Sequence, residues 1–181
     1  MQTQMLKVDV DRLCKSPASS LAYLKLVRES QYTDSDLVFE GFTDIDALAF
    51  NYMLVPTLRV SSLNTALLLT QGLNGKIIKA LSNIIPKDML AKTLSVSQTN
   101  LSNQYRKKEL DKTQSEAIVE FLHIWSELMV LFGDDTELVK EWLVGKKRPL
   151  CGMAPVDLMD IAVGRKAVLE MIDRIKMGDF S

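Results

Sequence analysis

A long stripe of apolar residues at helical spacing constrains this chain more than any other feature. The large apolar residues between positions 118 and 132 recur about every 3.6 residues, as on one side of an α-helix: Ile118, Phe121, Leu122, Trp125, Leu128, Met129 and Phe132. Residues 113–116 fit a capping box at its start, and Gly133 fits the left-handed position beyond its end. A stripe of about four turns has to be covered, so we expect a mainly α fold.

Shorter apolar stripes predict helices on both sides of this one. One helix is expected after Ser16-Pro17, and a second over 45–54, with Asp44 as its cap and Pro56 as its end. A third is expected after Asn74-Gly75. Two more are expected from Asp134 or Asp135 to Gly145 and over 168–175, before Gly178. Two short runs, Leu37–Phe39 and Thr57–Val60, are β-branched enough to form strands. The segment from Pro149 to Pro155 is expected to be a loop.

The composition excludes several classes of protein. The chain is 47% hydrophobic and 25% charged, which suits one globular domain or two small ones. Its 22 basic and 23 acidic residues give a net charge of −1, so any nucleic-acid site must be a local patch. Two cysteines and one histidine are too few for a disulfide framework or for a zinc site of cysteines and histidines.

No signature of a catalytic site stands out in the sequence. The motifs of serine hydrolases, P-loop proteins, dinucleotide-binding domains and zinc proteases are missing. His123 lies within the apolar stripe and is better explained as a buried or rim histidine. Asp134 and Asp135 are better explained as helix caps than as an acid–base pair. We expect no enzyme, no cofactor and no metal site.

The sequence contains no recognisable signal for secretion or for membrane insertion. The first twenty residues carry charges throughout and contain no apolar core of a signal peptide. No apolar run approaches the length that a membrane-spanning helix needs. The sequence therefore predicts a cytoplasmic protein with no membrane partner.

The positive charge is concentrated in one short central segment. Residues 86–112 contain six basic residues (Lys87, Lys92, Arg106, Lys107, Lys108 and Lys112) against three acidic ones (Asp88, Glu109 and Asp111), a net charge of +3. The surplus suggests that this segment meets an anionic partner.

The same segment has the pattern of a helix-turn-helix. Ala91 supplies the small residue that two steeply crossing helices need where they touch. An apolar wedge between the helices is expected from Leu90, Leu94, Val96 and Leu101. Ser97 is a natural cap for the second helix. Ser95 stands where the turn usually has glycine, so it must adopt a left-handed conformation unless the turn adjusts.

The second helix of this pattern is polar and not acidic. Its amides and hydroxyls match the base edges of the major groove: Gln98, Thr99, Asn100, Asn103 and Gln104. The basic residues that follow are placed to meet phosphate: Arg106, Lys107 and Lys108. We expect operator DNA as a partner and a homodimer that reads two half-sites. The alternative is a pair of packed amphipathic helices with a solvated polar face.

Residues from about 58 to 181 resemble the Xre/MbcA/ParS-type antitoxins that are paired with RES-domain toxins. The resemblance rests on the helix-turn-helix residues together with Tyr105-Arg106-Lys107, Leu110-Asp111, Ser115-Glu116, Phe132-Gly133-Asp134, Trp142-Leu143, Pro149-Leu150, Gly152, Pro155-Val156-Asp157-Leu158, Gly164-Arg165 and Gly178-Asp179-Phe180. It implies an antitoxin that holds a cognate RES-domain toxin inactive and represses its own operon. Toxins of this type deplete NAD⁺, so NAD⁺ would be the partner's substrate and not a cofactor here.

This resemblance divides the chain into three parts. It implies an N-terminal extension at 1–57, an Xre-like helix-turn-helix domain at 58–132 and a small helical toxin-binding domain at 133–181. The extension contains the expected strand at Leu37–Phe39, and its role stays open between a dimer contact, a cover for the toxin and a satellite subdomain. The core of the last part is expected from Trp142, Leu143, Leu150, Leu158, Val168 and Ile172.

The C-terminal tail is a candidate toxin contact. A pocket that holds NAD⁺ needs cationic groups for the pyrophosphate and a slot for a ring, which a carboxylate and an aromatic side chain could fill. The candidate residues in the tail are Gly178, Asp179 and Phe180. Arg165 and Lys166 on the preceding helix are expected to pair with acidic residues at the rim of the toxin. The alternative is that the tail is a frayed terminus.

Two further segments can each be explained in more than one way. Lys146-Lys147-Arg148 is either a second phosphate patch or a solvated charge run. The exposed part of residues 113–132 could form the dimer surface, unless that helix lies wholly in the core. For the whole chain, a stand-alone helix-turn-helix regulator without a toxin is the second candidate function, and an enzyme is the least favoured one.

Overall fold

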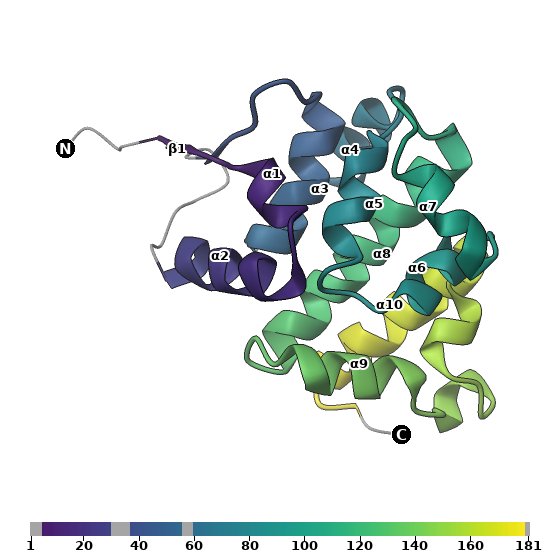
Figure 1. Cartoon of the computed structure of the whole chain (residues 1–181). Coiled ribbons are helices and arrows are strands. Elements are labelled where there is room, and N and C mark those ends of the chain that lie inside the picture. The colour runs from purple at the N-terminus through teal and green to yellow at the C-terminus, as the bar shows by residue number, and fades with distance from the viewer. Residues whose placement is uncertain (1–4, 30–36, 56–59, 180–181) are drawn as a thin grey trace.

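The computed structural model describes residues 5–29, 37–55 and 60–179. In these ranges helices dominate, as expected, and they surround one central helix, α8 (Figure 1). The elements in chain order are β1 (Leu6–Lys7), α1 (Val10–Leu13), α2 (Pro17–Glu29), β2 (Leu37–Val38), α3 (Asp44–Leu54), α4 (Ser62–Leu68), α5 (Gly75–Leu81), α6 (Lys87–Thr93), the 3₁₀-helix η2 (Gln98–Asn100), α7 (Leu101–Gln104), α8 (Lys112–Leu131), α9 (Thr136–Val144), the 3₁₀-helices η3 (Arg148–Leu150) and η4 (Pro155–Leu158), and α10 (Ala162–Lys176).

Helix α8 forms the centre of the core. Phe121, Trp125 and Leu128 on it are at most 1% exposed, and helices α3, α6, α9 and α10 pack around it. Burial extends to nearly every side of this helix, and Val130, near its end, is a large apolar residue that stays exposed. Most of residues 113–132 therefore lie in the core, which was one of the two alternatives for this helix, and a dimer surface on its exposed part stays a prediction.

The start of α8 differs from the expected capping box at 113–116. The helix begins at Lys112, and the carboxylate of Asp111 caps it by accepting a hydrogen bond from the Gln114 amide at 2.8 Å. Ser115 is fully buried, and its hydroxyl donates to the Asp111 carbonyl and accepts from the Leu73 amide. These buried bonds fix Ser115 inside the first turn, so the helix starts earlier than Thr113.

The turn from α8 to α9 follows the sequence prediction. Gly133 has a φ of 62° just beyond the end of α8, where a left-handed residue closes the helix. Asp134 is left-handed too, with a φ of 65°. Asp135 then caps α9 and accepts from the amides of Glu137 and Leu138. The two aspartates are thus turn and cap residues, as expected.

The N-terminal part folds onto the same core. Leu13, Tyr23, Leu24 and Val27 belong to one buried cluster with residues of α5 and α8. The side-chain amide of Asn83, which follows α5, donates a hydrogen bond to the Leu13 carbonyl at 2.8 Å. Residues 5–29 and 37–55 are therefore packed against the rest of the chain and do not form a separate satellite subdomain.

Two short strands confirm one of the strand predictions. Leu37–Val38 pairs in parallel with Leu6–Lys7, an edge that the sequence analysis did not anticipate. Most of the second expected strand, at 57–60, lies outside the described residues, as does Pro56. The following helix α3 is capped by Thr43 and not by Asp44, because Thr43 forms a reciprocal capping box with Asp46.

No helix in the described part of the chain is both long enough and apolar enough to span a bilayer.

Candidate functional site

The packing of α6, η2 and α7 is consistent with the expected helix-turn-helix. Leu90, Leu94 and Leu101 are at most 3% exposed and fill the angle between the two helices. Ala91 is buried at their contact, and its carbonyl accepts from the Val96 amide at 2.9 Å. The expected wedge is thus in place, with Val96 half-buried at its edge.

The turn residue Ser95 adopts the left-handed conformation. Its φ is 53°, which few residues other than glycine favour. The turn therefore keeps the usual geometry without glycine, at a cost in backbone strain.

The second helix starts at Ser97, whose hydroxyl accepts from the Asn100 amide at 3.3 Å. It begins as the 3₁₀-turn η2 and continues as α7. The candidate DNA-binding side chains are all exposed: Gln98, Thr99, Asn100, Asn103, Arg106, Lys107 and Lys108. The structure brings them together on the second helix and on the loop that follows it.

Gln104 is an exception to the expected polar face. Its side chain is buried, and Oε1 lacks a hydrogen-bond partner within the described residues. The cause is the close packing of α7 on the start of α5, where a Cβ at Gly75 would lie 2.1 Å from the Gln104 carbonyl oxygen. Gln104 is therefore a packing residue and not available for base contacts.

The residues of the C-terminal part enclose a small core, as predicted. Leu143, Val168 and Ile172 are fully buried, and Leu150 is 9% exposed. Trp142 and Leu158 are half-buried against this cluster. The Lys147 amine lies 4.9 Å from the centre of the Trp142 ring, and partial burial lowers its pKa. Lys147 thus has a packing role, whereas Lys146 and Arg148 are exposed.

Arg165 occupies a different place from the expected toxin surface. It is 3% exposed, its Nε lies 2.5 Å from Glu120 Oε2 on α8, and Nη1 donates to the Met159 carbonyl at 2.7 Å. A buried guanidinium needs such partners because its charge has lost contact with water. Arg165 therefore positions α10 on α8 and is not free to meet an acidic group of a partner.

Three other candidate toxin-binding residues, Lys166, Gly178 and Asp179, lie on the surface. Lys166 is exposed, and its amine lies 3.8 Å from Glu170 Oε1. Gly178 has a φ of 81° and turns the chain away from α10, as expected. Asp179 folds back so that its carboxylate accepts from Arg174 Nε at 3.1 Å. Phe180 lies outside the described residues.

The structure adds a set of apolar surface residues that the sequence analysis missed. They are Leu138, Val144, Met153, Ile161 and Val163, with exposures from 43% to 74%. Ile161 and Val163 flank the first residue of α10, and Val163 is the most exposed of the set. The signal was present in the sequence, because both positions fall outside the 168, 172, 175 stripe that marks the buried side of α10.

The lone histidine has packing partners, in line with the sequence interpretation. The His123 ring stacks on Tyr52 with centroids 5.5 Å apart, and its Nε2 lies 3.5 Å from Glu127 Oε1. Within the described ranges, no group of three or more histidine, cysteine, aspartate and glutamate residues is placed to hold a metal ion.

An ion pair joins the two candidate surfaces. Lys92 on α6 binds Asp157 on η4, and this hydrogen bond is the main reason that the pKa of Asp157 is lowered. Helix α6, the first helix of the expected helix-turn-helix, is thus linked directly to the C-terminal part.

Comparison with known families identifies the C-terminal part. Residues 127–178 match the family described as the antitoxin Xre/MbcA/ParS C-terminal toxin-binding domain. The match begins inside α8, earlier than the expected boundary at 133, and includes Arg165 and its surroundings. A search of curated proteins found no match to the chain. The end of α8, α9 and α10 are therefore similar to the C-terminal toxin-binding domain of the Xre/MbcA/ParS antitoxins.

Proposed function

We propose that this chain is an antitoxin that binds and inactivates a cognate RES-type toxin, which degrades NAD⁺, and that it represses its own operon. The observation that carries the proposal is the toxin-binding domain at 127–178, joined to a second helix whose exposed side chains are polar and basic. The choice of a RES-type toxin rests on the resemblance of residues 58–181 to antitoxins of that pairing. The chain itself would supply binding and no catalysis.

The toxin contact would use the surface of α9, α10 and the segment between them. Val144, Ile161 and Val163 are large apolar residues of this part that are each more than half exposed, and their burial against a toxin would be favourable. Lys166 on α10 adds a positive group that could pair with an acidic rim. Burial of the apolar residues would provide most of the binding free energy, and Lys166 would contribute to orientation.

The tail after α10 would enter the pocket of the toxin. Gly178 allows the chain to leave the helix axis, and Asp179 presents a carboxylate beside it. In the free chain this carboxylate accepts from Arg174, so entry into a cationic pocket would exchange one positive partner for another. Phe180 would supply the ring.

The DNA contact would use the second helix of the helix-turn-helix. Gln98, Asn100 and Asn103 offer amide groups of the kind that pair with adenine in the major groove. The residues that follow, Arg106, Lys107 and Lys108, would bind phosphate and fix the position of the helix. A single module of this size contacts few base pairs, so a homodimer on two half-sites would give useful selectivity.

Growth rescue tests the proposed antitoxin role. A RES-type toxin taken as the candidate cognate partner is expressed alone, with the chain, and with a chain that ends at Met177. Growth should resume with the full chain, because the toxin would be held inactive. Continued arrest despite soluble, folded chain would overturn the proposal. Full rescue by the chain ending at Met177 would remove the tail from the contact and leave the domain in place.

A further inference from the structure

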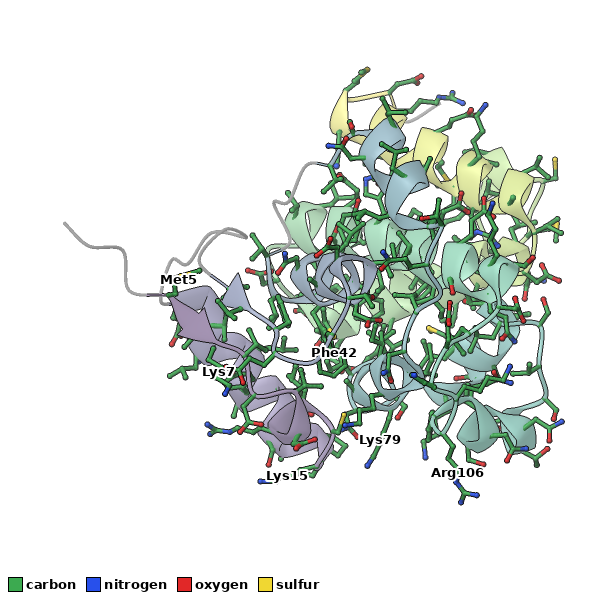
Figure 2. All side chains as sticks on the ribbon, turned by 90° about the horizontal axis from the view of Figure 1, so that it is seen from above. Met5, Lys7, Lys15, Phe42, Lys79 and Arg106 are labelled. Atoms are coloured by element: carbon green, nitrogen blue, oxygen red, sulfur yellow. The ribbon has the colours of Figure 1, made fainter. Side chains whose placement is uncertain are left out.

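Three lysines outside the helix-turn-helix extend its basic side. They are Lys15, in the corner between α1 and α2, and Lys76 and Lys79 on α5, and all three are exposed. Figure 2 shows Lys15, Lys79 and Arg106 along one edge of the molecule, with their side chains pointing outward on the same side. We call Lys15, Lys76 and Lys79 the flanking lysines.

Close backbone packing fixes α5 beside the end of α7. The Gly75 amide donates to the Lys107 carbonyl at 3.0 Å, and a Cβ at Gly75 would lie 2.7 Å from that same oxygen. Only glycine allows this approach without a shift of the backbone. Lys76 directly follows Gly75 in the chain. Its backbone is therefore next to the contact between Gly75 and the basic loop 106–108.

The N-terminal corner is fixed against the same helix. The Cys14 thiol donates to the Lys76 carbonyl at 3.6 Å, and the Asn83 amide donates to the Leu13 carbonyl at 2.8 Å. Ser20, which is fully buried, also donates to the Leu13 carbonyl, at 2.6 Å. Lys15 is therefore carried by a rigid corner next to α5.

The charges of the flanking lysines are available to a partner. In the ranges that the structure describes, no carboxylate lies within ion-pair distance of Lys15, Lys76 or Lys79. Asp9, Asp11 and Glu40 line a surface pocket together with Lys76, and Glu40 pairs with Lys7. Lysines that have no ion-pair partner among the described residues and are held by packed backbone next to a basic loop are suited to bind successive anions.

We propose that Lys15, Lys76 and Lys79 bind backbone phosphates of duplex DNA beside the base pairs that Gln98–Asn103 would contact. This inference rests on the proposed DNA-binding function and assigns a role to the N-terminal extension, which carries Lys15. Phosphates follow one another along a duplex, so a basic edge that continues from Arg106 would meet the next phosphates in turn. These contacts would add affinity and would not distinguish sequences.

The test compares salt dependence of binding for two matched double variants. In Lys15→Ala/Lys79→Ala, the slope of log affinity against log salt should fall by about two, since each lost phosphate contact lowers it by about 0.9. The loss should be equal on the upstream region of the operon and on random duplex. The control Lys25→Ala/Lys140→Ala makes the same change in charge at lysines that pair with Glu29 and Glu137 on their own helices, and its slope should match the wild type.

The outcomes separate this inference from the proposed function. If Lys107→Ala lowers the slope but Lys15→Ala/Lys79→Ala does not, the flanking lysines bind no DNA and this inference is overturned, while the helix-turn-helix proposal stands. If the wild-type chain binds no duplex at all, both are overturned. If the flanking and control variants lose slope equally, the effect is one of net charge, which also overturns the inference. Identical thermal midpoints for the variants and the wild type will establish that the fold is kept.

Discussion

Arg165 on α10 and Glu120 on α8 form an ion pair that joins the family-matched C-terminal part to the central helix. The guanidinium is almost completely buried, with Nε 2.5 Å from Glu120 Oε2, whereas the glutamate side chain is 35% exposed. Loss of the ion pair should therefore cost more when the buried arginine is left alone than when the partly exposed glutamate is. Without Glu120 a buried positive charge loses its counter-ion, whereas without Arg165 the carboxylate can still be hydrated.

Replacement of Glu120 by alanine should destabilise the fold strongly. Breaking a buried ion pair from one side costs about 3–5 kcal/mol, and partial exposure of the glutamate should reduce this to about 2–4 kcal/mol. Urea unfolding will give the change in the free energy of unfolding. Glu116→Ala, one turn earlier on α8, is the matched control and should change stability by no more than about 0.5 kcal/mol. Equal effects of the two changes would contradict the role of the buried pair.

Ser95→Gly should stabilise the chain. A left-handed non-glycine residue costs about 1–2 kcal/mol, and the greater freedom of glycine in the unfolded chain returns part of that. We expect a net gain of about 0.5–1 kcal/mol in thermal or urea unfolding. Ser95→Val should have the opposite sign, because a β-branched residue fits this conformation poorly. A loss of stability in the glycine variant would show that the serine side chain matters more than its backbone.

The Lys92–Asp157 pair should give a small, pH-dependent contribution to stability. The hydrogen bond from Lys92 lowers the pKa of Asp157 in the folded state, so the unfolded chain binds more protons in that range. The contribution is present above the ordinary aspartate pKa of about 4 and is lost as the pH falls through the lower folded value. Asp157→Asn should therefore cost less than about 1 kcal/mol at neutral pH, since the pair is exposed, and almost nothing in acid. Urea midpoints across the pH range will measure this, and a pH-independent difference would contradict it.

The candidate DNA-binding residues should divide into two classes by their effect. Lys107→Ala and Lys108→Ala should each weaken binding to operator and random duplex alike and lower the salt slope by about one. Gln98→Ala or Asn100→Ala should cost roughly 1–3 kcal/mol on the operator and little on random DNA. Binding titrations with the upstream region will separate the classes. Unchanged affinity in all four variants would exclude this side of the helix-turn-helix.

The sequence predicted those elements whose signals are local. The stripe around Phe121 and Trp125, the left-handed Gly133 and the Ser97 cap depend on neighbours within a few residues, and the structure confirms them. Periodicity does not reveal which elements cover a helix, so the sequence left open whether part of α8 is exposed. The structure shows that most of α8 is covered within the chain.

The errors at single polar residues have a common physical cause. Arg165 and Gln104 look like surface residues in the sequence, yet both are buried by contacts with distant segments, Glu120 and Gly75 respectively. The cap of α8 moved to Asp111 because Ser115 bonds to Leu73, more than forty residues away. Long-range partners of this kind leave no mark on a local pattern, whereas the exposure of Lys107, Lys108 and Lys166 followed from local polarity.

The central claim is that this chain inactivates a RES-type toxin by direct binding. The most direct measurement is the rate of NAD⁺ consumption by the purified toxin as purified chain is added. The account predicts that consumption falls in proportion to added chain and stops at a fixed ratio of the two proteins, with Lys166→Glu requiring more chain to reach the same inhibition. Undiminished NAD⁺ consumption in the presence of a large excess of folded wild-type chain would contradict the account.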